Sequence, residues 1–282
     1  MIYVSLAYSG NEDLKESIRM LSDAGFKNIE LSGNFDLCDE LENDLISLKA
    51  RYNLNYLCHN YFPGTKQSFV LNMASLNDEI YKRSLSHFKN LIKLSKKLNS
   101  PKVGFHAGFF MDITSKEIGS NLSARTLFNR EKSLKRFCEG FNELKDMAGA
   151  LELYLENNVI SHANFKAFGR VNPLMLTSYD DFAELKKVID FKLLLDIGHL
   201  KVSAASLGLD FEDELNKMIS VSDYLHCSDN DGLSDQNKPL LVNSDLFQQL
   251  KNYPLDSKTI TLEIDGGVEY IKNCYNLLAG MC

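Results

Sequence analysis

Short apolar runs alternate with helix-like segments along the whole chain. Eight runs have the length and composition of buried parallel strands, and they lie at 1–8, 28–31, 55–59, 103–106, 153–156, 193–196, 223–226 and 261–263. Strands that alternate with helices pair in parallel, and eight is the number that closes a (β/α)8 barrel. We therefore predict an α/β fold of the TIM-barrel type.

The helix-like segments are consistent with a single barrel domain over residues 1–282. We expect helices at 11–24, 39–52, 75–98, 130–148, 179–188, 211–219, 245–250 and 267–278, with the longest irregular stretch at 157–177. An open doubly wound sheet is the rival fold, but it normally carries a glycine-rich phosphate turn after its first strand. Here that turn reads Tyr8-Ser9-Gly10-Asn11. The length also suits one barrel, which takes about 250 residues.

Six of the strand-like runs end in a side chain that can bind a metal or move a proton. These residues are His59, His106, Glu156, Asp196, His226 and Glu263. One such ending means little, because an aspartate can cap a helix and a histidine can belong to the core. Six predict a ring of polar groups at the C-terminal mouth of the barrel, where active sites of this fold lie.

Four of these residues end consecutive strands, which are neighbours in a closed barrel. Glu156, Asp196 and Glu263 would repel one another in a mouth of low dielectric. Three carboxylates and the imidazole of His226 suit a divalent cation of intermediate hardness. We therefore predict a metal site with Mn²⁺, Co²⁺ or Zn²⁺ as the cofactor.

Five segments resemble the xylose isomerase-like barrel superfamily, which joins sugar isomerases and epimerases to the endonuclease IV type of DNA-repair enzyme. They are 24–31, 105–108, 155–158, 195–199 and 225–232, with Glu263 completing the set. The Asp196-x-x-His199 and His226-x-x-Asp229 patterns are fairly specific. The resemblance implies metal binding at the same four residues, and either further metal binding or substrate contact at His59, His106 and His199.

One departure from the family bears on its nuclease branch. The resemblance implies that the repair nucleases hold a further zinc with the histidine matching His199 and an Asp-x-His pair after the seventh strand. Here that loop reads Ser234-Asp235-Gln236-Asn237, and Asn237 replaces the histidine. A neutral amide is a poor zinc ligand. The formal net charge of −7 also gives little attraction for a DNA backbone, so we expect no nucleic-acid partner.

We therefore predict a metal-dependent isomerase or epimerase of a small sugar, sugar phosphate or keto-polyol. The metal would stabilise the enediolate formed when a hydroxyketone loses a proton. Glu156 and Glu263 would act as base and acid on opposite sides of the metal. His106, His199 and Asn157 would bind substrate, although Asn157 is equally compatible with orienting Glu156 or with a plain turn.

Alternatives stay open at this stage. A keto-polyol dehydratase would use the same residues, because its first step also forms an enolate. An endonuclease IV-like phosphodiesterase acting at apurinic sites belongs to a different class, and a sugar-binding barrel without turnover is a third possibility. A second metal held by His59 and His106 with Glu156 is a further expectation.

Location and partners follow from what the sequence lacks. The first residues have no basic segment or cleavage site, and no window approaches the roughly 18 apolar residues of a membrane span. Six cysteines form no CxxC pair, and strand alternation should turn Cys58 and Cys227 away from the site as buried, inert thiols. We expect a cytoplasmic protein with a small-molecule sugar substrate and no membrane contact. A homo-oligomer is compatible with the sequence.

Expectations also follow for polar residues outside the set of strand ends. His87, in the helix expected at 75–98, and His162, in a loop, should both be solvated. Lys166 and Arg170 are expected to be surface cations. Glu30 ends the second strand, where a place on the pocket floor and a structural hydrogen bond are equally open.

Overall fold

The computed structural model describes residues 1–10, 13–33, 35, 40–65 and 69–281. Its eight parallel strands pair in chain order, and β1 also pairs with β8, so the sheet closes into a barrel. The strands are β1 (Ile2–Ser5), β2 (Asn28–Leu31), β3 (Asn55–His59), β4 (Lys102–His106), β5 (Glu152–Glu156), β6 (Lys192–Asp196), β7 (Tyr224–Cys227) and β8 (Thr259–Leu262). The predicted (β/α)8 TIM barrel is confirmed.

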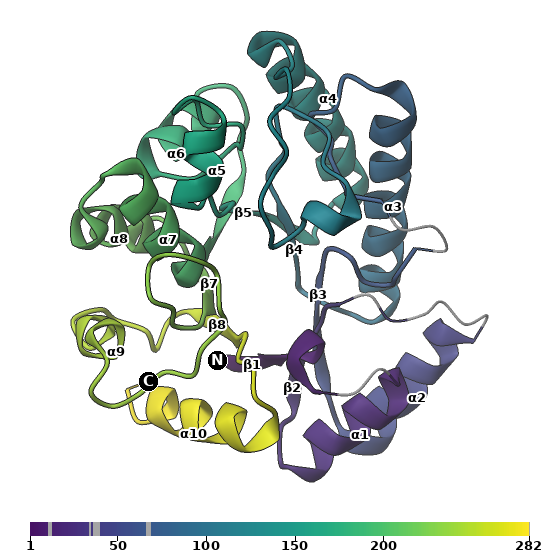
Figure 1. Ribbon diagram of the computed structural model, residues 1–282. Helices are drawn as coiled ribbons and strands as arrows, with labels where there is room; N and C mark the ends of the chain where they lie inside the picture. The colour runs from purple at the N-terminus through teal and green to yellow at the C-terminus, as the bar shows by residue number, and fades with distance from the viewer. Residues whose placement is uncertain (11–12, 34, 36–39, 66–68, 282) are drawn as a thin grey trace.

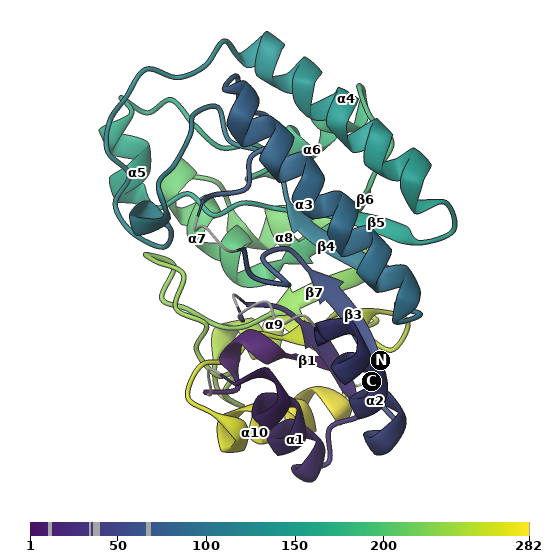
Figure 2. The same ribbon diagram turned by 90° about the vertical axis from the view of Figure 1, so that its right-hand side faces the viewer.

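Helices surround the barrel, as Figure 1 shows from the end where the loops after β4 and β7 lie in front. They are α1 (Leu14–Asp23), α2 (Leu41–Tyr52), α3 (Asp78–Lys97), α4 (Arg130–Ala148), α5 (His162–Ala167), α6 (Tyr179–Lys186), α7 (Ile197–Leu207), α8 (Phe211–Ser220), α9 (Asp245–Leu250) and α10 (Val268–Ala279). Two 3-10 helices, η1 (Leu6–Tyr8) and η2 (Ser115–Glu117), follow β1 and β4. The long helices α3 and α4 pack side by side on one flank (Figure 2).

The local sequence explains where the two longest helices begin. The side chain of Asn77 accepts a hydrogen bond from the backbone N–H of Glu79 and caps α3. Asn129 caps α4 in the same way through the N–H of Lys132. Such caps satisfy N–H groups that have no partner inside the helix. The predicted span 130–148 is confirmed, whereas α3 begins at Asp78, three residues after the predicted start.

Several boundaries differ from expectation. The first strand ends at Ser5, because the chain turns into η1 there, and α5 lies inside the stretch expected to be irregular. Helix α7 was not expected at all, although Asp196 caps its start and Gly208 ends it with φ 72°. The predicted helix starts at positions 11 and 39, and the cysteines at 38 and 282, lie outside the described residues.

Strand alternation divides the core into two parts. Outward side chains pack beneath the helices, and Cys58 and Cys227 lie in this outer core as expected. Inward side chains form a second cluster that fills the lower barrel; it consists of Tyr3, Leu57, Tyr154, Leu194 and Tyr224. We call it the inner cluster. The Lys102 ammonium closes this end, 4.8 Å and 5.3 Å from the ring centroids of Tyr154 and Tyr224.

The expectation for His87 was wrong. This residue is buried within α3, one turn before the fully buried Leu91, and faces the barrel. Helical spacing places it on the apolar face, so its position outweighed its residue type. His162, Lys166 and Arg170 are exposed as expected.

None of the described helices is long and apolar enough to cross a membrane.

Candidate metal centre

The strand-end residues converge at the C-terminal mouth of the barrel. Four of them, His59, Glu156, Asp196 and His226, lie two residues after a member of the inner cluster on the same strand, so their side chains point inward. One ligand atom from each of the four predicted metal ligands lies within 4.8 Å of the other three, and all four residues are buried. Opposite ligands of one cation at about 2.1 Å are about 4.2 Å apart, so small adjustments would allow a shared ion. These four are Glu156, Asp196, His226 and Glu263.

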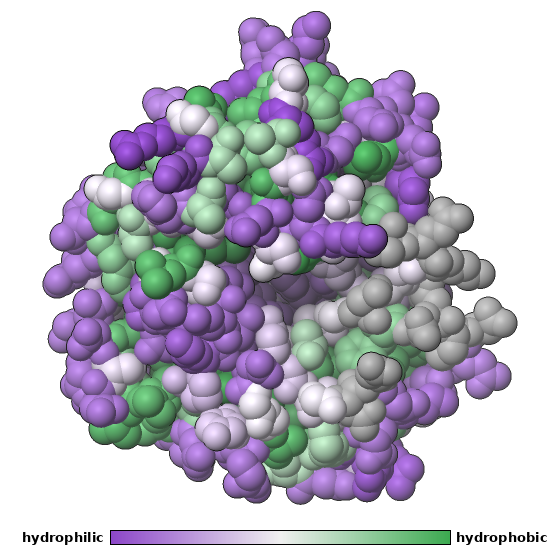
Figure 3. Space-filling model, in the orientation of Figure 1, coloured by the Kyte–Doolittle hydropathy of each residue, from purple (hydrophilic) through white to green (hydrophobic). Residues whose placement is uncertain are grey.

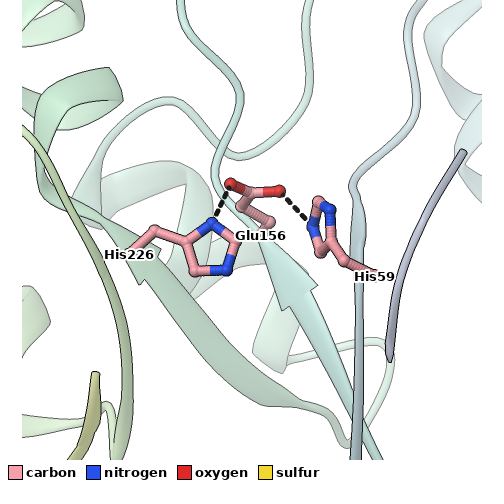
Figure 4. A group of neighbouring side chains, drawn as sticks. All are labelled: His59, Glu156 and His226. Atoms are coloured by element: carbon pink, nitrogen blue, oxygen red, sulfur yellow. Dashed lines mark hydrogen bonds and ion pairs between the residues drawn. The ribbon is translucent and has the colours of Figure 1, made fainter. Parts of the chain in front are cut away.

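Glu156 is the centre of the cluster. Its Oε2 lies 2.8 Å from Nε2 of His59 and 2.9 Å from Nδ1 of His106. Its Oε1 lies 3.2 Å from Nδ1 of His226. Figure 4 shows the carboxylate between His59 and His226, with one oxygen directed at each ring. A single carboxylate therefore links strands β3, β4, β5 and β7.

Strand register and one glycine explain how these side chains fit. His106 pairs with Glu156 across β4 and β5, and Asp196 pairs with His226 across β6 and β7. Gly104 is the inward residue of β4 beneath His106, and a Cβ there would meet Cδ2 of Leu194 at 2.7 Å and Cδ2 of His59 at 2.8 Å. The missing side chain makes room for the His59 imidazole.

The ring of His226 is held from below. Its Nε2 lies 3.1 Å and 3.2 Å from the two carboxylate oxygens of Glu30, so Nε2–H donates downward. Its Nδ1 faces Oε1 of Glu156 at 3.2 Å and Oε2 of Glu263 at 3.4 Å. This Nδ1 is buried and has no hydrogen-bond partner among the described residues. The same is true of Nδ1 of His106. Unpartnered imidazole nitrogens that face carboxylates fit a divalent cation.

His199 has the opposite ring orientation. Its Nδ1–H donates to the backbone carbonyl of Asn157 at 2.9 Å, and Nε2 lies 3.3 Å from Asp235. The Asn157 amide bonds the backbone N–H and C=O of Asp196 at 2.7 Å and 2.9 Å. Asn157 is fully buried and does not line the cavity. The substrate-binding expectation for its side chain is therefore not supported, because the amide joins β5 to β6 and the carbonyl orients His199.

The two histidines considered for a second metal fall into separate groups. His59 clusters with Glu156 and His226, whereas His106 clusters with Glu156 and His199. Both rings contact the same oxygen of Glu156. The structure thus brings each histidine to Glu156, but with a different third residue.

Burial disfavours every charge in the cluster, and the neighbours decide each protonation state. Burial would raise the pKa of Glu156, but the surrounding imidazoles, His106 foremost, hold it well below its usual range. Burial would lower the pKa of His226, but Glu30 and the other carboxylates raise it well above its usual range. For Asp196, burial dominates and raises the pKa. A cation that binds here must therefore displace protons.

A cavity of about 760 Å³ opens above the cluster, and Figure 3 shows the surface hollowed near the centre of this face. Glu156, Glu263, His106 and His199 line it, together with Tyr8, which the sequence analysis did not assign. Tyr8 ends the first predicted strand. A search for polar side chains at strand ends would therefore have identified it if tyrosine had been counted with the histidines and carboxylates. Burial first, and then Glu263, raise the pKa of Tyr8.

A second, larger hollow of about 1040 Å³ lies at the other end of the barrel. Glu152, Lys192 and Asp223, at or next to the N-terminal ends of β5, β6 and β7, contribute to its wall. None of the strand-end residues lines it. We therefore assign the candidate site to the C-terminal mouth.

The loop after β7 brings Asp235 to the site, but Asn237 differs from the nuclease pattern. Asp235 contacts Nε2 of His199, whereas Oδ1 of Asn237 accepts a hydrogen bond from Ser228 at 3.3 Å. Asn237 also lines the cavity and has φ 46°. The loop thus supplies one carboxylate and one amide to this side of the mouth.

Comparisons with known proteins agree with the barrel fold. A family model described as xylose isomerase-like TIM barrel matches residues 18–271. The uncharacterised protein MJ1311 of Methanocaldococcus jannaschii is 24% identical over 230 residues, which cover 80% of this chain and 69% of that protein.

Solved structures show the same fold. A D-tagatose 3-epimerase-like protein has a TM-score of 0.73 at 18% identity, covering 99% of this chain and 96% of that one. Endonuclease IV from Thermus thermophilus has a TM-score of 0.63 at 16% identity, covering 99% and 98%. Sequence identity this low supports a shared architecture and not a shared activity.

Proposed function

Because the chain belongs to the xylose isomerase-like TIM barrel family, we propose that it is a metal-dependent isomerase or epimerase of a small sugar, sugar phosphate or keto-polyol. The substrate would enter the cavity above the strand ends. Structural relatives that include a D-tagatose 3-epimerase-like protein, a D-psicose 3-epimerase and an L-ribulose 3-epimerase support the proposal. A single domain over residues 1–282, a cytoplasmic location and the oligomeric state stay predictions.

The ligand set proposed for the cation is Glu156, Asp196, His226 and Glu263. Their mixed oxygen and nitrogen donors suit Mn²⁺, Co²⁺ or Zn²⁺. When bound, the cation supplies positive charge that stabilises an enediolate. The buried Nδ1 of His226, which has no hydrogen-bond partner among the described residues, is the observation that favours a cation over a purely structural cluster.

The arrangement of two glutamates carries the proposal for proton transfer. Oε1 of Glu156 and Oε2 of Glu263 lie 3.2 Å and 3.4 Å from the same atom, Nδ1 of His226, and both residues line the cavity. One carboxylate removes the proton from the carbon next to the substrate carbonyl, and the other returns a proton. His106 and His199 line the same cavity and bind substrate hydroxyls.

The test is incorporation of solvent deuterium into candidate ketoses. Metal-loaded protein is incubated with each sugar in D₂O, and the carbon next to the carbonyl is followed by NMR. We expect deuterium at this carbon in both substrate and product, and no exchange with the Glu156→Gln variant. Turnover of a ketose without any deuterium uptake would contradict exchangeable proton transfer through an enediolate.

A dehydratase of a keto-polyol would use the same glutamates. Loss of one water from the substrate, measured by mass spectrometry in the same incubation, distinguishes it from an isomerase. The shared first step predicts deuterium exchange in either case.

A phosphodiesterase of the endonuclease IV type is the second candidate. The contact of 3.3 Å between His199 and Asp235 favours it, since both residues match the expected zinc ligands of that branch. Asn237 weighs against it, because an amide replaces the expected imidazole. Incision of abasic DNA tests this candidate directly.

A further inference from the structure

Glu30 is a carboxylate buried inside the barrel. It lies on β2, is 0% exposed and points inward between Ser5 of β1 and Leu57 of β3 in the strand register. Among the described residues, no lysine or arginine forms an ion pair with it. Burial of an unpaired carboxylate is costly unless donors satisfy it. A carboxylate in this position therefore needs hydrogen-bond donors from the surrounding strands.

Three donors from two strands reach this carboxylate. Thr261 Oγ1 donates to Oε2 at 3.0 Å, and the hydroxyl of Tyr224 donates to the same oxygen. Nε2 of His226 lies 3.1 Å from Oε1 and 3.2 Å from Oε2. Glu30 therefore lies directly beneath the one histidine of the proposed ligand set.

This contact determines the tautomer of His226. A carboxylate can only accept, so the proton of the neutral ring lies on Nε2 and the lone pair lies on Nδ1. Nδ1 then faces Glu156 and Glu263, where a metal ligand is needed. An anionic partner also makes an imidazole a more basic, stronger ligand.

His199 provides an internal comparison. Its second nitrogen donates to the backbone carbonyl of Asn157, which is neutral. Both rings are oriented by a partner on the far side from the cluster, and this far-side partner is a carboxylate for His226 but a neutral carbonyl for His199. The carboxylate of Asp235 contacts the opposite nitrogen of His199. The two histidines are therefore not equivalent as ligands.

We propose that Glu30 is a positioning residue of the metal site: it holds Nδ1 of His226 toward Glu156 and Glu263 and strengthens this nitrogen as a ligand. The inference rests on the proposed metal site, but it does not depend on which sugar reacts or by which reaction.

Metal affinity tests the proposal. Glu30→Gln keeps the shape and one acceptor oxygen but removes the charge. Affinity for Co²⁺ is measured by competition with a coloured chelator, and the Co²⁺ absorption spectrum reports on the ligand field. We expect affinity to fall about 10- to 100-fold, which is typical when the partner of a ligating histidine is lost.

Tyr224→Phe is the matched control. It removes a different donor from the same Glu30 oxygen but leaves the carboxylate charge and the contact to His226. We expect its Co²⁺ affinity to stay within about threefold of the wild type. A folded Glu30→Gln protein with an affinity this close to wild type would overturn the proposal, and so would an equal loss in both variants.

Wild-type protein keeps the proposal testable if Glu30→Gln does not fold. In Zn²⁺-loaded protein labelled with ¹⁵N-histidine, the proton of His226 should lie on Nε2 and the metal on Nδ1. The resonances are assigned by their loss in His226→Gln. A proton on Nδ1 would overturn the role of Glu30 alone. Failure of the wild type to bind any divalent cation would instead remove the proposed metal site itself.

Discussion

Replacing His87 by leucine should make the free energy of unfolding less dependent on pH. His87 is 9% exposed, and its Nε2 has no hydrogen-bond partner among the described residues. Burial lowers its pKa to about 4. In the unfolded chain a histidine has a pKa of about 6.5, so the two states bind the proton in different pH ranges.

The sign and size of the effect follow from these two values. Between about pH 6.5 and pH 4 the unfolded chain binds a proton that the folded protein excludes, so stability falls as the pH falls. A difference of about 2.5 pKa units at about 1.4 kcal/mol per unit gives about 3.5 kcal/mol in total. About 2 kcal/mol of this should be lost between about pH 7.5 and about pH 5.

The measurement is urea denaturation of both proteins at these two pH values, with a chelator present. The chain has no tryptophan, so circular dichroism is the suitable signal. The substitution also changes stability by an amount independent of pH, which cancels when each protein is compared with itself. His162→Ala is the control, because this histidine is exposed and should leave the pH dependence unchanged. Equal losses for wild type and His87→Leu, within about 0.5 kcal/mol, would refute the reasoning.

The remaining predictions concern the site. Glu156→Gln and Glu263→Gln should each abolish deuterium exchange, with losses beyond the roughly 10²–10⁴-fold of general acid–base catalysis, because each residue should also bind metal; near-wild-type rates would disprove the proposed roles. Gly104→Ala should displace His59 and weaken the binding of any second metal, while the first metal stays bound. Diffraction data collected at a zinc absorption edge would then show one peak in the variant instead of two. Metal-loaded protein should not incise a duplex with one abasic site at low salt, because Asn237 replaces a zinc ligand; specific, metal-dependent incision would favour the nuclease instead.

The sequence was sufficient to predict the barrel and the residues that converge in it. Each strand is short, apolar and bounded by helical spacing, and parallel strands bring their C-terminal ends to one mouth. Glu156 and Asp196 could therefore be assigned to the same cluster, although they end different strands, β5 and β6, and lie far apart in the sequence. The inward parity of the strand ends needed no contact information.

Features that depend on contacts between distant strands could not be predicted in this way. The role of Glu30 requires the register of β2 against β7 and β8, which no local pattern encodes. Helix α7 was missed because it is buried on most sides, so its sequence lacks a polar face with helical period. The burial of His87 is consistent with its helical spacing to Leu91, whereas its residue type alone suggests exposure.

The inner cluster determines how molecules reach the candidate site. Tyr154 and Tyr224 fill the lower barrel, and Lys102 covers their rings, so the interior is not a channel. Substrate, product and solvent must then all pass through the opening at the C-terminal end. The proposed isomerase would make a product of the same size as its substrate, and each product would leave by the opening that the next substrate enters. Substrate and product of such an enzyme would therefore use the same opening, because the packed barrel floor closes the other end.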